Sequence, residues 1–315
     1  MKIADETLQS IGRALRDGAA LAFVRGSLKA GYLEFFPNQP IDRLVDQALD
    51  ELAASQAAGL DGQQLLGVAD RLVKQTFRGG DRSFWFNQVY HRYKTELKPA
   101  AEFEQLVGLI AGRRVLDYGC GSGYLANRLA QGGYTVLTTD VLDYRFPEAR
   151  HVPFVRLASP AERPYPAGSA DTALVQAVLH HVNPPDLPQV IRGLSQMAAT
   201  VLIKEDTYDL PADLPGLAET LARQPLLRAF LALPRETQFQ ALVLIDFFAN
   251  VLAQGVSEMN LPFGFKPVSE WQTLLAANGL PVRRVLPVGF EPGRMHKSCH
   301  VWLICGQGLA QGRDA

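Results

Sequence analysis

Three glycines on alternate positions follow a short apolar run that ends in an acidic residue. The stretch V-L-D-Y-G-C-G-S-G-Y, residues 115–124, contains Asp117 and then Gly119, Gly121 and Gly123. Glycine after a buried strand lets the backbone turn tightly and lets a ligand touch it, and the helix that follows directs unpaired N–H groups at that ligand. The stretch therefore predicts a site for a nucleotide-like or carboxylate-bearing small molecule.

A second acidic residue indicates the kind of molecule. Asp140 ends the next apolar run, 21 residues after Gly119, where a carboxylate can accept both hydroxyls of a ribose. The dinucleotide fingerprint requires a further glycine where this chain has Tyr124. Asp117 would repel a pyrophosphate but attract an ammonium group. These residues favour S-adenosylmethionine, which has an amino group, a sulfonium and no phosphates, over a dinucleotide.

Candidate proton-transfer groups follow two later apolar runs. His180 and His181 come after D-T-A-L-V-Q, and Glu205 ends T-V-L-I-K-E. Histidine titrates near neutral pH, so either ring could take a proton from a hydroxyl or an activated carbon, and Glu205 could orient it. The alternative is that one histidine packs beside the cofactor and the other faces solvent.

Polar residues inside an apolar helix are candidates for binding the acceptor. Asp246 and Asn250 are four residues apart in A-L-V-L-I-D-F-F-A-N-V-L and therefore share one helix face. They either hydrogen-bond to each other or to neighbouring backbone, or they line an acceptor pocket together with Phe247, Phe248 and Asn260.

The hydrophobic periodicity predicts the elements that position these residues. Residues 6–107 have apolar positions at helical spacing, whereas short β-rich runs alternate with helices from residue 114 onward. Such alternation predicts a parallel sheet covered on both faces. One helix is expected at about 187–197, and residues 209–262 read as a helical cap inserted after the fifth strand.

The end of the chain is expected to complete the sheet. Ser269 and Gln272 predict a capping box at the start of a helix, and V-R-R-V-L-P-V and H-V-W-L-I-C predict an antiparallel hairpin. The expected fold is a doubly wound α/β, Rossmann-like architecture with a mostly parallel seven-stranded sheet. Its expected parts are an N-terminal helical region or lid, 1–107, and a domain with the cap insertion, 108–315.

The composition is that of an ordinary globular protein. The chain has 315 residues, 47% of them hydrophobic, and a formal net charge of -1, so a nucleic acid is not an expected partner. The N-terminus lacks a basic segment followed by an apolar run, and no stretch of about 18 apolar residues occurs. We therefore expect a cytoplasmic protein without a membrane segment. Cys120, Cys299 and Cys305 are expected to be reduced thiols.

At this point the chain resembles a known family, the class I S-adenosylmethionine-dependent methyltransferases, and especially their small-molecule branch. The first motif of that branch reads V-L-D-x-G-x-G-x-G. The resemblance extends from about residue 114 to residue 205 and includes Asp140, the segment A-E-R-P-Y-P-A-G-S-A-D that ends at Asp171, and V-L-H-H-V at 178–182.

The resemblance implies roles for individual residues. The loop Gly119–Gly123 would cradle the methionine part of the cofactor and Asp140 would bind its ribose. Val141 and Leu142 would pack on the adenine, and Ser159 with the backbone of Ala158 would stand in place of a family aspartate that binds the adenine amino group. Gln176 would lie beneath the methionine part. The other implied cofactor contacts are Asp117, Cys120, and, in a lid, Tyr90 and Tyr93. Core packing is the alternative for the two tyrosines.

The resemblance implies methyl transfer to carbon or oxygen of a small metabolite or natural product. No metal is expected, because metal-dependent O-methylating relatives carry Glu-x-x-Glu-His where this chain has Ala177 and His180. His296 and His300, with Cys299 between them, are explained by a surface loop rather than a zinc site. The alternatives are a nicotinamide-dependent oxidoreductase and a non-catalytic cofactor-binding or interaction protein. A homodimer stays open.

Overall fold

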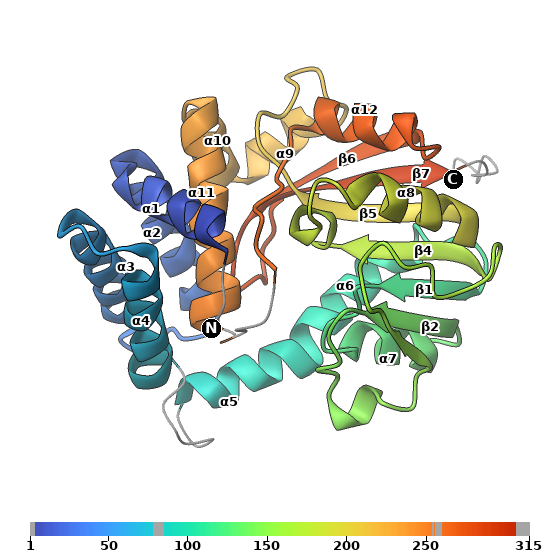
Figure 1. Cartoon of the computed structure of the whole chain (residues 1–315), viewed down its shortest axis with the longest axis horizontal. Helices are drawn as coiled ribbons and strands as arrows, with labels where there is room; N and C mark the ends of the chain where they lie inside the picture. The colour runs from blue at the N-terminus through green and yellow to red at the C-terminus, as the bar shows by residue number, and fades with distance from the viewer. Residues whose placement is uncertain (1–3, 78–84, 254, 256–259, 307–315) are drawn as a thin grey trace. The chain divides into compact units, whose positions relative to one another are not determined.

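The computed structural model describes residues 4–77, 85–253, 255 and 260–306 (Figure 1). Its contacts divide the chain into two compact units. The first unit comprises Met1–Tyr93, Asp206–Phe265 and Val288–His300, and the second comprises Lys94–Glu205, Lys266–Pro287 and Val301–Ala315. The division at residue 107 and the cap at 209–262 stay predictions of the sequence. Residues 254 and 256–259 of that cap lie outside the described residues.

Seven strands form one sheet in the order β3-β2-β1-β4-β5-β7-β6. They are β1 (Arg114–Tyr118), β2 (Thr135–Asp140), β3 (Phe154–Arg156), β4 (Ala170–Gln176), β5 (Ala198–Asp206), β6 (Val282–Phe290) and β7 (Cys299–Gly306). Strands β1 to β5 are parallel and the C-terminal strands are antiparallel, with β7 between β5 and β6. The predicted sheet is confirmed. Its strand order reverses between β1 and β4, which is where ligands of doubly wound folds bind.

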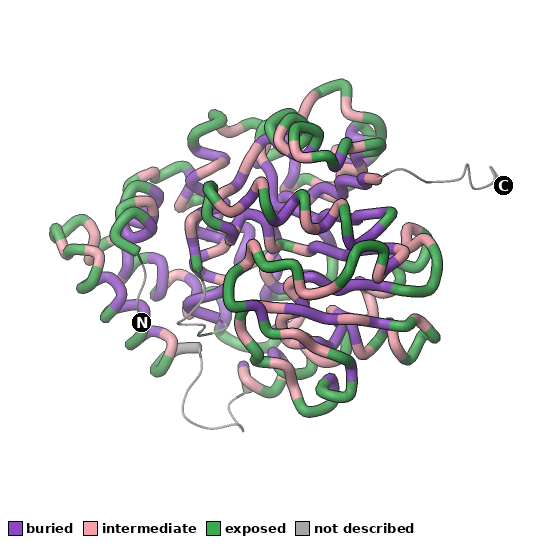
Figure 2. Tube along the Cα trace, turned by 45° about the vertical axis from the view of Figure 1, so that its right-hand side comes forward, coloured by how far each residue is buried: buried purple, intermediate pink, exposed green. Residues whose placement is uncertain are grey.

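The helices of the second unit flank this sheet. They are α6 (Lys98–Val107), α7 (Tyr124–Gln131), α8 (Leu187–Met197) and α12 (Val268–Ala277), with 3₁₀ turns at Pro147–Ala149 and Leu179–His181. Strands β4 and β5 are buried along nearly their whole length, because helices cover both faces of a parallel sheet. Figure 2 colours the buried residues of the chain purple. The predicted capping box is wrong, because α12 begins at Val268, two residues before a helix capped by Ser269 would begin, and has no side-chain cap.

The first unit contains the remaining helices. They are α1 (Asp5–Arg16), α2 (Gly18–Leu33), α3 (Ile41–Ala57), α4 (Gly62–Leu72), α5 (Trp85–Arg92), α9 (Leu217–Arg223), α10 (Pro225–Leu231) and α11 (Arg235–Phe247), with π-helical turns at Val73–Phe77 and Phe248–Ala253. A further π-helical turn, Tyr93–Leu97, begins at the last residue of the segment Met1–Tyr93 and belongs mostly to the second unit. Helix α11 contacts α1 and α2 and is buried along most of its length. Its buried residues include the apolar run 241–245 and the polar residues Thr237, Gln238 and Gln240. Pro225 begins a new helix and so separates α10 from α9.

Two further predictions can be compared with the structure. Among the described helices, none combines the length and the apolar character needed to cross a bilayer. All three cysteines are buried and free, as expected for reduced thiols.

Candidate active site

The glycine-rich turn lies between β1 and α7, at the carboxyl edge of the sheet. Its first and last glycines have left-handed backbones, with φ of 75° at Gly119 and 77° at Gly123. The N–H groups of Gly119 and Cys120 donate to the carbonyl of Thr139. A Cβ at Gly119 would lie 2.5 Å from Cγ2 of Val178. The sequence suggested that a ligand excludes side chains here, but backbone conformation and neighbouring protein atoms already do so at Gly119.

Asp140 holds this turn from the adjacent strand. Its carboxylate accepts hydrogen bonds from the N–H of Gly121, at 2.9 Å, and the N–H of Leu142, at 3.2 Å. Burial raises the pKa of Asp140, and the backbone N–H groups around it partly oppose that rise. The carboxylate lies next to the glycine turn, as binding of a ribose there would require.

Asp117 makes this edge of the sheet acidic. The residue is 5% exposed, and burial together with the charges of Glu102 and Asp140 raises its pKa to about 7. Glu102 lies on α6 and forms an ion pair with Lys98 at 3.6 Å. Three carboxyl groups outnumber this lysine, so the local potential favours a cationic ligand and disfavours a pyrophosphate.

Gln176 supplies an acceptor at the same edge. It is the last residue of β4 and follows Val175, which pairs with Tyr118 of β1. Its Oε1 is buried and has no hydrogen-bond partner among the described residues. Leaving a buried acceptor unsatisfied costs about 1–3 kcal/mol, so this oxygen is ready to accept from a bound donor such as an ammonium group.

Three other residues predicted to contact the cofactor, Val141, Leu142 and Cys120, follow Asp140 or Gly119 in the sequence. Val141, 37% exposed, follows Asp140, and the half-buried Leu142 comes next. An exposed valine at a strand end is suited to pack on a flat apolar ligand. Cys120 is buried within the turn, and burial raises the pKa of its thiol, which indicates packing rather than reactivity.

The loop after β3 contains the residue that stands in for the family aspartate. Ser159 is exposed, and its Oγ accepts the N–H of Ala161 at 3.1 Å. The N–H of Ala158 donates to the carboxylate of Glu162 at 2.8 Å. The N–H of Ala158 is therefore already used within the loop, so of the loop's backbone groups only the carbonyl oxygens could take over the acceptor role of the aspartate.

A buried histidine–glutamate pair lies at the carboxyl ends of β4 and β5. Nδ1 of His180 lies 2.5 Å from Oε2 of Glu205, and the two side chains are 1% and 0% exposed. The other oxygen of Glu205 accepts the N–H groups of Val178, at 3.0 Å, and Leu179, at 2.7 Å. Glu205 therefore shapes the turn after β4 and orients His180 at the same time.

The turn after β4 has an unusual backbone. Ala177 has a φ of 52°, in the left-handed region that side chains rarely adopt, and its N–H donates to the carbonyl of Lys204 at 2.7 Å. The rings of His180 and His181 lie 4.1 Å apart. The sequence allowed either histidine as the base and favoured His181 together with Glu205, whereas in the structure Glu205 contacts His180.

Comparison with protein families identifies the chain. A family model described as a methyltransferase domain matches residues 87–247, just over half of the chain. The chain belongs to this methyltransferase family. The membership confirms the expected S-adenosylmethionine-dependent methyltransferase.

Individual relatives of this methyltransferase match it over shorter segments. A ubiquinone biosynthesis O-methyltransferase of Bordetella avium (strain 197N) is 32% identical over 107 residues, 30% of this chain and 42% of that protein. The protein of the same name from Ralstonia nicotianae (strain ATCC BAA-1114 / GMI1000) is 30% identical over 130 residues, 36% of this chain and 54% of that protein. The methyltransferase thus spans about half the length of the curated relatives it matches.

Solved structures with a similar fold are more distant. The 1,6-didemethyltoxoflavin-N1-methyltransferase of Burkholderia thailandensis, with bound 1,6-didemethyltoxoflavin and S-adenosylhomocysteine, has a TM-score of 0.42 and 15% identity, covering 69% of this chain and 80% of that one. An S-adenosylmethionine-dependent methyltransferase of Mesorhizobium loti has a TM-score of 0.43 and 19% identity, covering 67% and 100%.

The second unit of the methyltransferase fits S-adenosylmethionine. The cofactor carries positive charge on its ammonium and sulfonium groups, which suits the acidic edge at Asp117 and Glu102. The buried oxygen of Gln176 offers an acceptor, and Asp140 lies beside the glycine turn. The cofactor prediction is confirmed by the family, whereas the roles of these residues stay predictions.

The predicted acceptor residues belong to the first unit. Nδ2 of Asn250 donates to Oδ1 of Asp246 at 2.7 Å, so the two polar side chains do hydrogen-bond to each other. Phe247 and Asn250 are buried, and Asn260 is exposed. The contact explains how this apolar helix accommodates two polar residues.

The two lid tyrosines also belong to the first unit and lie in an aromatic cluster. The ring of Tyr90 stacks on Phe86 with centroids 5.6 Å apart and an interplanar angle of 10°. The hydroxyl of Tyr93 accepts the N–H of Met295 at 3.3 Å, and its ring packs edge-on against Phe35. These contacts are those of core packing, the alternative considered for the pair.

The histidines near the last strand have protein partners. Nε2 of His296 lies 2.8 Å from the hydroxyl of Tyr32. The ring of His300 lies between Asp206, at 3.4 Å, and Glu291, at 3.3 Å. These polar contacts explain the two histidines without zinc.

The sequence did not single out two groups at the glycine turn. Glu102 lies on a helix whose alternating polar and apolar residues look ordinary, and only the fold places its charge near Asp117. Tyr144, four residues after Asp140, has its hydroxyl 3.3 Å from where a Cβ of Gly121 would lie. The sequence signal for Tyr144 was an aromatic residue shortly after Asp140, the acidic residue that ends β2.

Proposed function

We propose that this methyltransferase methylates the oxygen of a small organic acceptor, a metabolite or natural product, with His180 as the base. The observation that carries the proposal is the 2.5 Å contact between Nδ1 of His180 and Oε2 of Glu205. The pair lies at the carboxyl edge of the sheet, where the cofactor also binds in doubly wound folds. A base is needed where the acceptor atom starts protonated, as a hydroxyl does.

Glu205 determines which nitrogen of His180 acts as the base. Because the carboxylate accepts from Nδ1, that nitrogen carries the hydrogen and Nε2 carries the lone pair. Two backbone N–H groups fix the position of the carboxylate and thereby the orientation of the ring. Nε2 is then the atom that takes the proton from the acceptor hydroxyl.

The rest of the proposed catalysis is alignment of the acceptor atom with the methyl group of the cofactor. When bound, S-adenosylmethionine supplies an electrophilic methyl group on its sulfonium. Asp117 and Gln176 would bind the ammonium group, Asp140 the ribose hydroxyls, and the turn Gly119–Gly123 the methionine part. A displacement of this kind depends mainly on holding the reactants in line and on excluding water, so a fixed binding site is itself catalytic.

Two observations favour oxygen over carbon as the acceptor atom. The curated relatives are named as O-methyltransferases of ubiquinone biosynthesis. A histidine paired with a carboxylate suits a phenolic hydroxyl, whose pKa near about 10 makes it a weak nucleophile until the proton leaves. Carbon methylation is the second candidate, because the same pair could deprotonate an activated carbon.

The test is methyl transfer from labelled S-adenosylmethionine to a panel of phenols, catechols and activated carbon acids. We expect an O-methylated product, identified by mass spectrometry and NMR. His180→Gln should lower turnover by about a hundredfold or more and leave binding of S-adenosylhomocysteine intact. His181→Ala is the matched control and should change turnover by no more than about threefold. Unchanged turnover in His180→Gln would overturn the assignment of the base.

The two alternative functions predict different results in cofactor-binding and methyl-transfer assays. A nicotinamide-dependent oxidoreductase would bind NAD in calorimetric titration and would not bind S-adenosylhomocysteine. A non-catalytic protein would bind S-adenosylhomocysteine, but no labelled product would form in an extract of the native host. Either result would end the proposal.

Other assignments from the sequence are kept as proposals. They are adenine contacts by Val141, Leu142 and Ser159, cofactor contacts by Cys120, Tyr90 and Tyr93, and acceptor contacts by Asp246, Phe247, Asn250 and Asn260. The cytoplasmic location, the homodimer and the lack of a nucleic-acid partner stay predictions of the sequence.

A further inference from the structure

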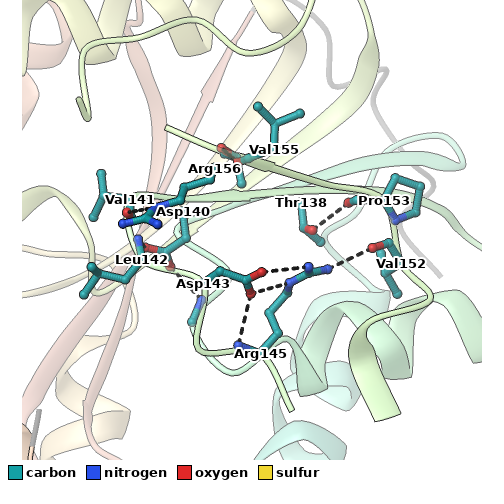
Figure 3. A network of polar contacts seen from close by, with 12 residues as sticks. Thr138, Asp140, Val141, Leu142, Asp143, Arg145, Val152, Pro153, Val155 and Arg156 are labelled. Atoms are coloured by element: carbon teal, nitrogen blue, oxygen red, sulfur yellow. Dashed lines mark hydrogen bonds and ion pairs between the residues drawn. The ribbon is translucent and has the colours of Figure 1, made fainter. Parts of the chain in front are cut away.

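Arg145 fastens the segment that follows Asp140 to the edge of the sheet (Figure 3). Its Nε and Nη2 donate to the two oxygens of Asp143 at 2.9 and 3.2 Å, and its Nη1 donates to the carbonyl of Val152 at 3.1 Å. The guanidinium carbon lies 4.0 Å from the centroid of the Phe154 ring. Only 9% of the Arg145 side chain is exposed. The arginine thus joins this segment to β3.

The same segment is also attached to the glycine turn. The N–H of Phe146 donates to the carbonyl of Ser122 at 3.1 Å, and the ring of Phe146 packs on Tyr124 with centroids 4.7 Å apart. The hydroxyl of Tyr124 donates to Glu148 at 3.2 Å. We call residues 141–149 the strap, because it is bonded to β3 on one side and to the glycine turn on the other.

Tyr144 lies on the strap, with its hydroxyl over the glycine turn. A Cβ at Gly121 would be 3.3 Å from that hydroxyl, although 40% of the tyrosine residue is exposed. Burial of the hydroxyl and the negative charge of Asp140 raise the pKa of Tyr144. The hydroxyl therefore lies close to both groups that are expected to bind the methionine and ribose parts of the cofactor.

An arginine is suited to fix such a loop before a ligand arrives. Its planar fork binds a carboxylate through two N–H groups and stacks on an aromatic ring, which an ammonium group on a flexible stem cannot do. A loop ordered in the free protein need not be ordered on binding, so the affinity for the ligand is higher.

We propose that Arg145 is a positioning residue for cofactor binding and that Tyr144, held in place by it, contacts the bound cofactor. The inference rests on the proposed cofactor site at Asp140 and Gly121. It adds the strap as a further wall of that site and assigns the strap's order to a side chain that does not touch the cofactor.

The experiment measures the dissociation constant of S-adenosylhomocysteine by calorimetry and the thermal midpoint of each variant. Arg145→Ala and Tyr144→Ala should each weaken binding about tenfold. Arg145→Lys should also weaken binding, because lysine keeps the charge and loses the fork. In the double variant the losses should not add, since Arg145 acts through Tyr144.

Arg114→Ala is the matched control. Arg114 donates through Nε and Nη2 to Asp171, at 3.0 and 2.6 Å, and through Nη1 to the carbonyl of Gly168, at 3.0 Å. Its hydrogen bonds are of the same kind as those of Arg145, but they lie at the start of β1, at the amino end of the parallel strands and away from the glycine turn. Its loss should lower the thermal midpoint and leave the dissociation constant within about twofold of the parent.

Three results would overturn the inference. Arg145→Ala and Arg114→Ala could weaken binding equally, Tyr144→Ala could bind like the parent, or the losses of the double variant could add. Failure of the proposed cofactor site itself would look different, because the parent protein would then not bind S-adenosylhomocysteine. Weakened binding in Asp140→Asn together with normal binding in both strap variants would reject the strap alone.

Discussion

Replacing Asp117 by asparagine should stabilise the ligand-free protein above pH 7 and weaken its binding of the cofactor. The pKa of this buried carboxyl is raised from 3.8 to about 7, chiefly by burial and then by the charges of Glu102 and Asp140. The folded protein therefore binds the proton more tightly than the unfolded chain. The stability that this proton contributes is complete below about pH 4 and is lost as the pH rises to about 7.

The size of the effect follows from the shift. A rise of roughly three pKa units at about 1.4 kcal/mol each corresponds to about 4 kcal/mol of the free energy of unfolding. Above pH 7 the parent protein carries a buried charge that asparagine removes, so Asp117→Asn should be more stable there by up to about 4 kcal/mol. A cationic ligand beside Asp117 favours the ionised form, so binding at pH 6 should release about one proton in the parent and none in the variant.

Urea unfolding at pH 5 and pH 8 measures the first effect. Calorimetry at pH 6 with S-adenosylmethionine, in two buffers of different ionisation enthalpy, measures the second. Asp171→Asn is the control of opposite sign, because hydrogen bonds from Arg114 lower the pKa of Asp171 to about 2. Its stabilising effect is present above about pH 4, so this variant should be less stable at both pH values. Equal pH dependence of stability in the parent and in Asp117→Asn would refute the reasoning from the acidic edge.

Three further predictions use the same stability and binding measurements. Glu205→Gln should lower the unfolding free energy by about 3 kcal/mol and also lower turnover, because the N–H groups of Val178 and Leu179 lose a charged acceptor; full stability with normal turnover would contradict both roles. Gly119→Ala should cost about 2 kcal/mol or more and abolish cofactor binding, because the new Cβ meets Val178 at 2.5 Å on a left-handed backbone; normal binding of S-adenosylhomocysteine would count against it. Gln176→Leu should keep or raise the thermal midpoint by removing a buried unsatisfied oxygen, yet weaken cofactor binding; unchanged affinity would show that this oxygen does not face the ligand.

The sequence predicted most of the fold because the apolar pattern of the sheet domain is strong. Helix α8 begins and ends at the predicted residues, 187 and 197, since it is amphipathic and stands between two buried strands. The capping box at Ser269 failed because α12 starts two residues earlier, with Pro267 as its N-cap residue. A local pattern of polar residues could not reveal that the chain already turns at the proline.

The site was predictable where the chemistry lies in one short segment, as in the glycine turn and Asp140. It was not predictable where partners meet only through the fold. His180 and His181 are adjacent, so the local sequence does not show which of them contacts Glu205. That contact depends on the turn after β4, in which Ala177 has a left-handed backbone. Arg145 likewise contacts Val152 and Phe154, which lie beyond its loop at a spacing that matches neither helix nor strand periodicity.

The hydrogen bonds of Glu205 bear on where His180 would release the proton that it takes up in the proposed reaction. One oxygen accepts two backbone N–H groups and the other accepts Nδ1 of His180, so both oxygens are engaged before any acceptor arrives. In the proposed mechanism, a proton taken up by Nε2 gives an imidazolium that the carboxylate stabilises without itself becoming protonated. The proton would then leave from Nε2, so recovery of the neutral imidazole would depend on departure of the methylated product from that nitrogen.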